Sequence, residues 1–447
     1  MRYKEEIHNY VQEHTREIID TLKELVRIPS VRGEAEERAP FGKECARILK
    51  HIRDLYDKNG FETELDADGG YLLSYFGKGE KSLGLFAHAD VVRVDNDWIY
   101  TNPFAPIEKE GYIIGRGAWD DKAAVVISLY CAKMLNELDI PFDSKLVMFT
   151  GSNEETGMED MANYLKAHIP PDFSLVCDSG FPMYCGDKSN IQFVASSNVL
   201  LKDITEFCGG NDFNISLGKA SAKIGEETVM ENGISRHGAL PEGSVNAGYL
   251  LSKKLSNMSE LCESDRKQME FVSEVLERYY GEIFGIECED ECFGKLTCTN
   301  GIIKTENGKV SLCFDLRYPY GLDANEIKRK IEEFFEKNDW NVEVVSEREG
   351  YIISKDDEYV KACIGAFNEF FGEENSNAYY NAGATYAREL PHSAEIGVTL
   401  YGGSPEGTPD GHGNVHQSDE CLNIEGMLLA LEVTMQMLIR CDEMNRK

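Results

Sequence analysis

Short apolar runs that each lead into a carboxylate or a histidine are the feature of this sequence that most constrains its fold. Runs of this length are typical of strands buried in a parallel sheet. The carboxyl ends of such strands meet at one edge of the sheet, where ligands collect. The runs are residues 83–87 before His88 and Asp90, 146–150 before Glu154 and Glu155, and 175–177 before Asp178. They predict a metal site with several carboxylates, which is more often catalytic than structural.

The first part of the chain, residues 1–187, alternates helix and strand patterns. Besides the runs above, we expect helices at about residues 3–27, 42–59 and 122–138 and a strand at 71–75. This alternation predicts an α/β domain with a mostly parallel sheet and helices on both faces.

A different composition begins near residue 188, where Gly, Asn, Thr and Glu become frequent. The strand pattern at 310–316 and the helix patterns at 245–255 and 324–336 predict an inserted α+β domain over residues 188–351. Residues 352–447 return to the first pattern and complete the first domain. The elements expected there are a helix at 358–371, a strand at 397–401 and a helix at 424–440.

Composition limits the possible partners and the compartment. The net charge of −33 repels nucleic-acid phosphates and anionic lipids, so neither is an expected partner. No run approaches the roughly 20 apolar residues of a membrane span. The N-terminal segment lacks the uninterrupted apolar stretch of a signal peptide. Thirteen cysteines without CxxC pairs indicate reduced thiols and a cytoplasmic protein.

His88 and Asp90 form the first candidate pair. Residues two apart in an extended chain face the same side, so Asp90 can hold the His88 ring. That contact would fix which ring nitrogen meets a metal. The alternative is a histidine at a strand end beside a solvated aspartate.

Glu154 and Glu155 follow the run at 146–150. Neighbouring side chains diverge, so one carboxylate can bind a metal while the other accepts a proton from the attacking water. The alternative is a pair of acids in a turn, which is unremarkable in a chain with 79 acidic residues.

Three further residues complete the candidate site. Asp120 lies where a helix is expected to begin, and its two oxygens could bridge two ions about 3.5–4 Å apart. An ordinary N-cap aspartate is the alternative. Asp178, followed by Ser-Gly-Phe-Pro, fits a turn equally well. His416, in the motif His-Gln-Ser-Asp-Glu, competes with His412 four residues earlier.

Together these motifs resemble those of the co-catalytic metallopeptidases, which include PepV- and Sapep-like dipeptidases, aminoacylases and glutamate carboxypeptidases. The likeness covers almost the whole chain. The matching segments are residues 28–31, 88–92, 115–122, 154–157 and the His416 motif.

The resemblance implies a role for each of these residues. One ion would be held by His88 and Asp178, the other by Glu155 and His416, and Asp120 would bridge both. Glu154 would be the general base. Asp90, by its contact with His88 argued above, is the further catalytic residue that we expect. The peptide bond after Asp120 would be cis.

The insertion resembles the PepV branch in particular, through residues 284–286, 294–297, 315–319 and the 233–247 region. In that branch the insertion is a lid. The resemblance implies that His237 helps to hold the oxyanion and that Arg317 and Asn214 contact the substrate. Gly383 and Arg388 are the further substrate-binding residues that it implies.

The function implied is that of a cytoplasmic dipeptidase with two divalent ions, zinc or manganese. It would hydrolyse dipeptides with free amino and carboxyl termini through a metal-bridging water. A deacylase for N-acyl amino acids with the same metal chemistry is one alternative. A catalytically inactive binding protein on this scaffold is another. A lid that completes its own site favours a monomer.

Overall fold

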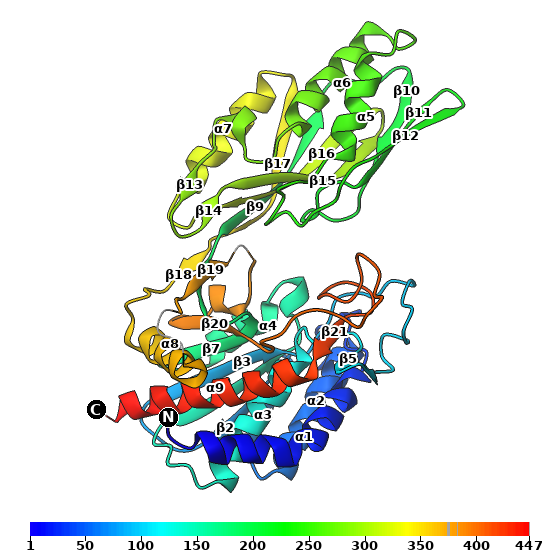
Figure 1. Ribbon diagram of the computed structural model, residues 1–447. Coiled ribbons are helices and arrows are strands. Elements are labelled where there is room, and N and C mark those ends of the chain that lie inside the picture. Colours follow the sequence, from blue (N-terminus) through cyan, green and yellow to red (C-terminus); the bar gives the residue numbers. More distant parts are fainter. Residues whose placement is uncertain (373–375, 382, 447) are drawn as a thin grey trace. The chain divides into compact units, whose positions relative to one another are not determined.

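The computed structural model describes residues 1–372, 376–381 and 383–446, which form two compact units. Unit 1 comprises Met1–Gly186, Ile353–Tyr379 and Thr385–Lys447, and unit 2 comprises Asp187–Ile352 and Tyr380–Ala384. The main boundaries lie within a residue or two of those expected from the sequence. The short segment Tyr380–Ala384, which sequence patterns assign to the first domain, groups with unit 2. Figure 1 follows the chain through both units.

Unit 1 is built on a sheet with the strand order β1-β2-β6-β3-β7-β20-β8. The central neighbours β6, β3, β7 and β20 run parallel, whereas the pairs toward both edges are antiparallel. The mostly parallel sheet predicted from the apolar runs is thus confirmed. The strands are β1 (Glu62–Asp66), β2 (Tyr71–Phe76), β3 (Ser82–His88), β6 (Lys145–Gly151), β7 (Phe173–Ser179), β8 (Tyr184–Asp187) and β20 (Ser393–Gly397).

Helices lie on both faces of this sheet. The helices of unit 1 are α1 (Lys4–Val26), α2 (Lys43–Lys58), α3 (Lys122–Glu137), α4 (Glu159–Ala167), α8 (Glu358–Phe371) and α9 (Ile424–Asn445). Tyr164 of α4 packs edge-on against Phe86, and Tyr359 of α8 stacks on Phe173. Phe173 pairs in register with Leu83, and Leu83 and Phe86 project from opposite faces of β3 because strand side chains alternate. Helices α4 and α8 therefore cover opposite faces.

A small second sheet in unit 1 joins two distant parts of the chain. Its order is β21-β5-β4, with β4 (Ile107–Lys109), β5 (Tyr112–Ile114) and β21 (Cys421–Asn423). Strand β21 pairs antiparallel with β5. The chain just before Asp120 is thereby fixed to the chain just after His416.

The prediction of a strand at residues 397–401 is wrong, because the structure places β20 at Ser393–Gly397. The cause is Glu395, a charged residue that is fully buried inside the strand and interrupts its apolar pattern. The apolar residues that follow, from Val398 on, lie outside the strand.

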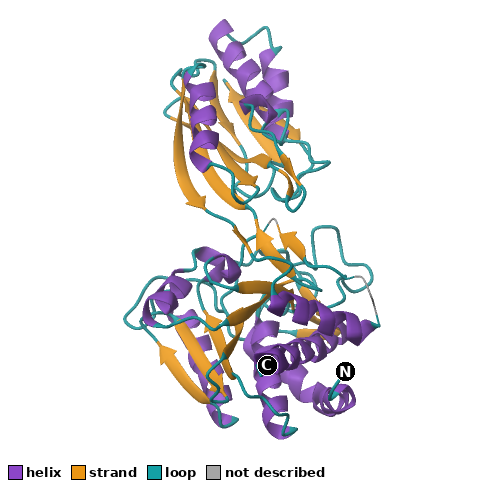
Figure 2. Ribbon diagram, turned by 90° about the vertical axis from the view of Figure 1, so that its left-hand side faces the viewer, coloured by secondary structure: helices purple, strands orange, loops and turns teal. Residues whose placement is uncertain are grey.

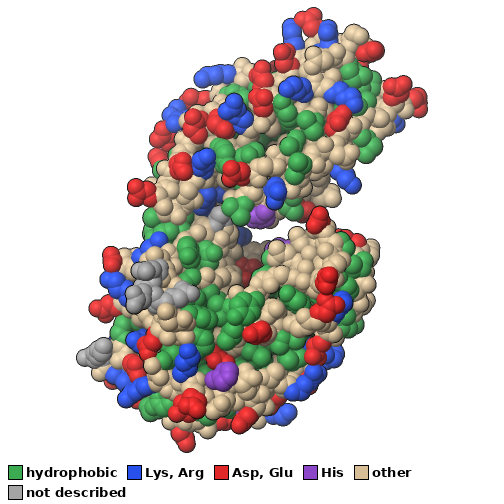
Figure 3. Space-filling view, in the orientation of Figure 1, with side chains coloured by type: hydrophobic (Ala, Val, Ile, Leu, Met, Phe, Trp, Pro, Cys, Tyr) green, Lys and Arg blue, Asp and Glu red, His purple; other side chains and the backbone are tan. Residues whose placement is uncertain are grey.

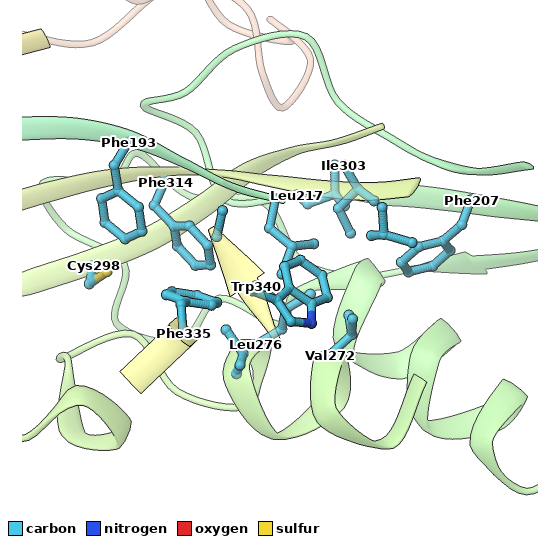
Figure 4. Close-up of a cluster of buried hydrophobic side chains, with 14 of the residues drawn as sticks. Phe193, Phe207, Leu217, Val272, Leu276, Cys298, Ile303, Phe314, Phe335 and Trp340 are labelled. Atoms are coloured by element: carbon cyan, nitrogen blue, oxygen red, sulfur yellow. The ribbon is translucent and has the colours of Figure 1, made fainter. Parts of the chain in front are cut away.

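Unit 2 contains an antiparallel sheet, β15-β16-β9-β17, and a smaller one, β10-β11-β12. Helices α5, α6 and α7 contribute to a core with Phe193, Phe314, Phe335 and Trp340 (Figure 4). Figure 2 distinguishes the helices and strands. The elements are β9 (Ser189–Ser197), β10 (Ile204–Cys208), β11 (Lys219–Ile224), β12 (Glu227–Asn232), α5 (Ala247–Ser256), α6 (Glu263–Leu276), β13 (Glu289–Asp290), β14 (Gly294–Lys295), β15 (Thr297–Glu306), β16 (Lys309–Tyr318), α7 (Ala324–Glu336) and β17 (Trp340–Arg348). Strands β18 (Tyr351–Ile352) and β19 (Tyr379–Asn381) lie where the chain passes between units.

Charges of both signs are interspersed on the face shown in Figure 3. No helix in the described part of the chain is long and apolar enough to cross a membrane. All thirteen cysteines, each within the described residues, are free thiols.

The aromatic core of unit 2 provides a test of the fold. Phe193 is 1 % exposed, and its ring stacks on Phe314 with centroids 4.8 Å apart. Phe193→Ala should lower the free energy of unfolding of this unit by about 3–5 kcal/mol, because it leaves a cavity. Hydrogen exchange of the β9 and β16 amides in denaturant measures this change. Val344→Ala, on an exposed part of β17, should cost no more than about 0.5 kcal/mol. Equal losses in the two variants would contradict the assigned core.

Candidate metal centre

The predicted ligands converge at the carboxyl edge of the unit 1 sheet. Strand β3 ends at His88, which pairs in register with Gly151, the last residue of β6. The next turn, a 3-10 helix at Glu154–Thr156, carries the two glutamates. Asp178 lies near the end of β7 and Asp120 just before α3. A Cβ atom at Gly151 would overlap the Tyr386 hydroxyl, so the chain needs glycine where β6 ends.

Asp120 lies at the centre of the cluster, between two histidines. Its Oδ1 is 3.0 Å from His88 Nε2, and its Oδ2 is 3.0 Å from His416 Nε2. The same His416 nitrogen is 3.1 Å from Glu155 Oε2. His88 Nε2 is 3.7 Å from Asp178 Oδ2. The structure thus forms two groups of donors, each with one histidine, that share one aspartate.

Glu154 adjoins the His88 group. One donor atom from each of His88, Glu154 and Asp178 lies within 4.8 Å of the other two. Burial raises the pKa of Glu154 well above its usual value, against the opposing effect of His88 and with a contribution from Asp178. A nearby cation would reverse this effect and favour the carboxylate form that a general base requires.

Neighbouring carboxylates favour the charged form of both histidines. Burial alone would lower the pKa of His416, but hydrogen bonds to Asp120 and Glu155 outweigh it and raise that pKa to about 11. The pKa of His88 is raised well above its usual value, since its carboxylate partners likewise outweigh burial. Burial would raise the pKa of Asp120, yet its contacts with His416 and His88 lower it well below the usual range.

The residues present fit a pair of divalent cations. Imidazole and carboxylate are ligands that zinc and manganese accept. Glu155 Oε1 is buried and has no hydrogen-bond partner among the residues that the structure describes. Burial also raises the pKa values of Glu155 and Asp178, which indicates that their negative charge is incompletely balanced.

Asp90 lies behind the two glutamates and holds their backbone. Its carboxylate oxygens accept hydrogen bonds from the backbone N–H groups of Glu154 (3.1 Å) and Glu155 (3.2 Å). His88 Nδ1 is 3.0 Å from the backbone carbonyl oxygen of Asp90 and 3.5 Å from its Oδ1. Asp90 can therefore orient His88 and the glutamate turn together, whereas the sequence suggested only the first contact.

His412 and His416 have different surroundings. His412 Nδ1 is 2.7 Å from Asp419 Oδ2. His416 faces Asp120 and has a left-handed backbone conformation, with φ of 62°. The peptide bond between Asp120 and Asp121 is cis, as the resemblance implied.

Three polar residues that the sequence did not single out support the site. Asp160, fully buried, accepts hydrogen bonds from the backbone N–H groups of Ser152 and Asn153 and from the Tyr386 hydroxyl. Glu420 and Arg116 form a buried ion pair. Glu420 belongs to the His416 motif and Arg116 to the segment before Asp120. The motifs therefore included both residues, but they did not show that the two side chains form an ion pair.

The candidate substrate residues divide between the units. In unit 2, the carbonyl oxygen of Asn214 accepts a hydrogen bond from Gly238, beside His237. Arg317 Nε donates to Asp315 Oδ2 at 2.7 Å. Gly383 also falls in unit 2, whereas Arg388 falls in unit 1, in a 3-10 helix at Tyr386–Arg388.

Comparisons with known proteins show the family and the fold. A protein of Staphylococcus epidermidis named "Putative dipeptidase" is 26% identical and aligns over 95% of this chain and 97% of its own. The crystal structure of human carnosine dipeptidase 1 matches with a TM-score of 0.62 at 14% identity, covering 99% of both chains. A tripeptidase structure from Staphylococcus aureus matches with a TM-score of 0.61 at 17% identity, covering 96% of this chain and 99% of that one. Residues 84–440 match the description Peptidase family M20/M25/M40, so the chain belongs to this family of metal-dependent hydrolases.

Proposed function

We propose that this protein is a dipeptidase that uses two divalent ions, zinc or manganese, to hydrolyse dipeptides with free amino and carboxyl termini. The observation that carries the proposal is Asp120, whose two oxygens each face a different histidine at 3.0 Å. The similarity to a staphylococcal protein named as a dipeptidase supports the substrate class.

The proposed ligand sets follow the two donor groups. His88 and Asp178 would hold one ion, Glu155 and His416 the other, and Asp120 would bridge them. When bound, such ions lower the pKa of a bridging water and polarise the scissile carbonyl.

Glu154 is the proposed general base. Its carboxylate accepts the proton of the attacking water and passes it to the leaving amine, which allows the peptide bond to break. Asp90 holds the turn that carries Glu154 through the backbone bonds described above. Its catalytic role is therefore to orient the base and His88.

Unit 2 contributes the proposed substrate contacts. His237 would donate a hydrogen bond to the oxyanion of the tetrahedral intermediate. Arg317, held by Asp315, presents a planar fork that suits the substrate carboxylate. Asn214 and Gly383 in this unit, and Arg388 in unit 1, complete the proposed set.

We also propose that the protein acts on small peptides in the cytoplasm, as a monomer. Its thirteen free cysteines support a reducing compartment.

Changing Glu154 or Glu155 to glutamine should have different effects on metal binding and on the rate of hydrolysis. Glu154→Gln should keep its metal but lose about 10²–10⁴-fold in rate, because it removes the base alone. Glu155→Gln should lose metal affinity as well. Metal content and dipeptide hydrolysis, measured on the same samples, test the assignment. A near wild-type rate for Glu154→Gln would refute it.

His416→Ala should bind less metal than the wild type, whereas His412→Ala should stay fully loaded, because only His416 contacts Asp120 and Glu155. Elemental analysis after dialysis should give two ions per wild-type chain, and chelation should abolish activity. Depletion of metal in His412→Ala alone would reverse the choice of ligand. One ion in a fully active wild type would contradict the two-ion site.

Arg317 should determine the preference for a free carboxyl terminus. Amidating the dipeptide should reduce kcat/KM by well over tenfold, since breaking a buried charge pair costs about 2–5 kcal/mol. In Arg317→Ala the acid and the amide should react at similar rates. Arg329→Ala, an exposed change on α7, is the control and should keep the difference. Faster cleavage of an N-acetylated substrate than of the free dipeptide would instead indicate a deacylase.

A further inference from the structure

A buried ion pair, Arg116 with Glu420, lies outside the proposed donor set. Arg116 Nη1 is 2.6 Å from Glu420 Oε2, and the side chains are 2 % and 0 % exposed. Removing two charges from water is unfavourable, so a buried pair by itself is weak evidence of stabilisation. The other groups that these two side chains bind are therefore more informative.

Glu420 binds the backbone of the loop that carries Asp120. Its Oε1 accepts hydrogen bonds from the N–H groups of Gly117 (3.1 Å), Trp119 (2.8 Å) and Asp120 itself (3.1 Å). Gly117 has φ of +84°, a conformation that favours glycine. The loop wraps around the Glu420 carboxylate, and these hydrogen bonds fix the backbone position of Asp120.

Arg116 extends the same connection to the His416 segment. Its Nη2 donates to the backbone oxygen of Gln417, the residue after His416, at 3.0 Å. The N–H of Gly115 donates to the backbone oxygen of Glu420 at 2.9 Å, next to the β5–β21 pairing. Two chain segments about three hundred residues apart are thus joined by one buried pair, and each segment carries a proposed ligand.

We propose that Glu420 and Arg116 are positioning residues that set the separation of Asp120 and His416, and thereby the affinity of the site for its ions. This inference rests on the proposed function, because it assigns the two residues to the same metal site. Groups behind metal ligands can act in this way, and their loss typically weakens metal binding about 10- to 100-fold.

The test is the affinity of metal-free protein for Zn²⁺, measured by calorimetry with a competing chelator. Glu420→Gln keeps one oxygen acceptor but loses the charge that pairs with Arg116. Its dissociation constant for Zn²⁺ should rise about 10- to 100-fold. Arg116→Lys keeps the positive charge, but an ammonium group cannot bind Glu420 and Gln417 together as the planar guanidinium does. The affinity of this variant for Zn²⁺ should therefore also be lower than that of the wild type.

Asp442→Asn is the matched control within unit 1. Asp442 is 1 % exposed, accepts hydrogen bonds from the N–H groups of Asp143 (2.9 Å) and Ser144 (2.7 Å), and pairs with Arg446. None of these partners adjoins a proposed ligand in the chain. This variant should lose thermal stability in chelator, as Glu420→Gln does, but should bind Zn²⁺ like the wild type.

Equal Zn²⁺ affinity in Glu420→Gln, Arg116→Lys and wild type, with only a lowered Tm, would overturn the inference and leave the proposed function intact. No Zn²⁺ binding by the wild type would overturn both.

A second test, hydrogen exchange on the metal-free wild type, does not depend on whether a variant folds. The amides of Gly117, Trp119 and Asp120 should be protected before metal is added. Exchange as fast as in exposed loops would also overturn the inference.

Discussion

The geometry of the site depends on buried carboxylates that bind backbone N–H groups. Asp90, Asp160 and Glu420 are at most 1 % exposed, and each accepts hydrogen bonds from two or more backbone groups of a segment at the carboxyl edge of the sheet. Carboxylate oxygens that accept several backbone N–H groups hold these segments in one conformation, and the bonds are stronger when the acid is ionised.

Two histidines offset part of the negative charge that gathers at the site. When protonated, His88 and His416 balance part of the charge of the carboxylates beside them. The pKa of His416 rises from 6.5 to about 11, so this stabilisation is fully present below pH 6.5 and is lost as the pH rises through 11. Metal binding requires neutral imidazole, so at the proposed site divalent ions would replace protons and their uptake would release acid.

The sequence could predict the parallel sheet and the meeting of its ligands, because buried strands leave apolar runs and their polar successors share an edge. The motif after His416 favoured it over His412, and His416 does lie beside Asp120 and Glu155, but its role as a ligand stays a prediction. The sequence could not place β20, since Glu395 interrupts the apolar pattern, nor assign Tyr380–Ala384 to unit 2. The backbone contacts of Asp160 and Glu420 were invisible as well. In a sequence, an aspartate or glutamate that will be buried cannot be told from one on the surface, because the backbone N–H groups that it binds are known only from the fold. The roles of His237, Asn214, Arg317, Gly383 and Arg388 stay predictions, because they concern a substrate.

The two histidines at the centre of the site differ sharply in access to solvent. The side chain of His88 is 1 % exposed, whereas that of His416 is 52 % exposed. If each holds one ion, the two positions exchange with solution on different timescales. Under the proposed two-ion arrangement, the ion beside His416 would leave first when a chelator is added. A half-loaded protein, with the His88 position filled, would then be a distinct species at low metal supply.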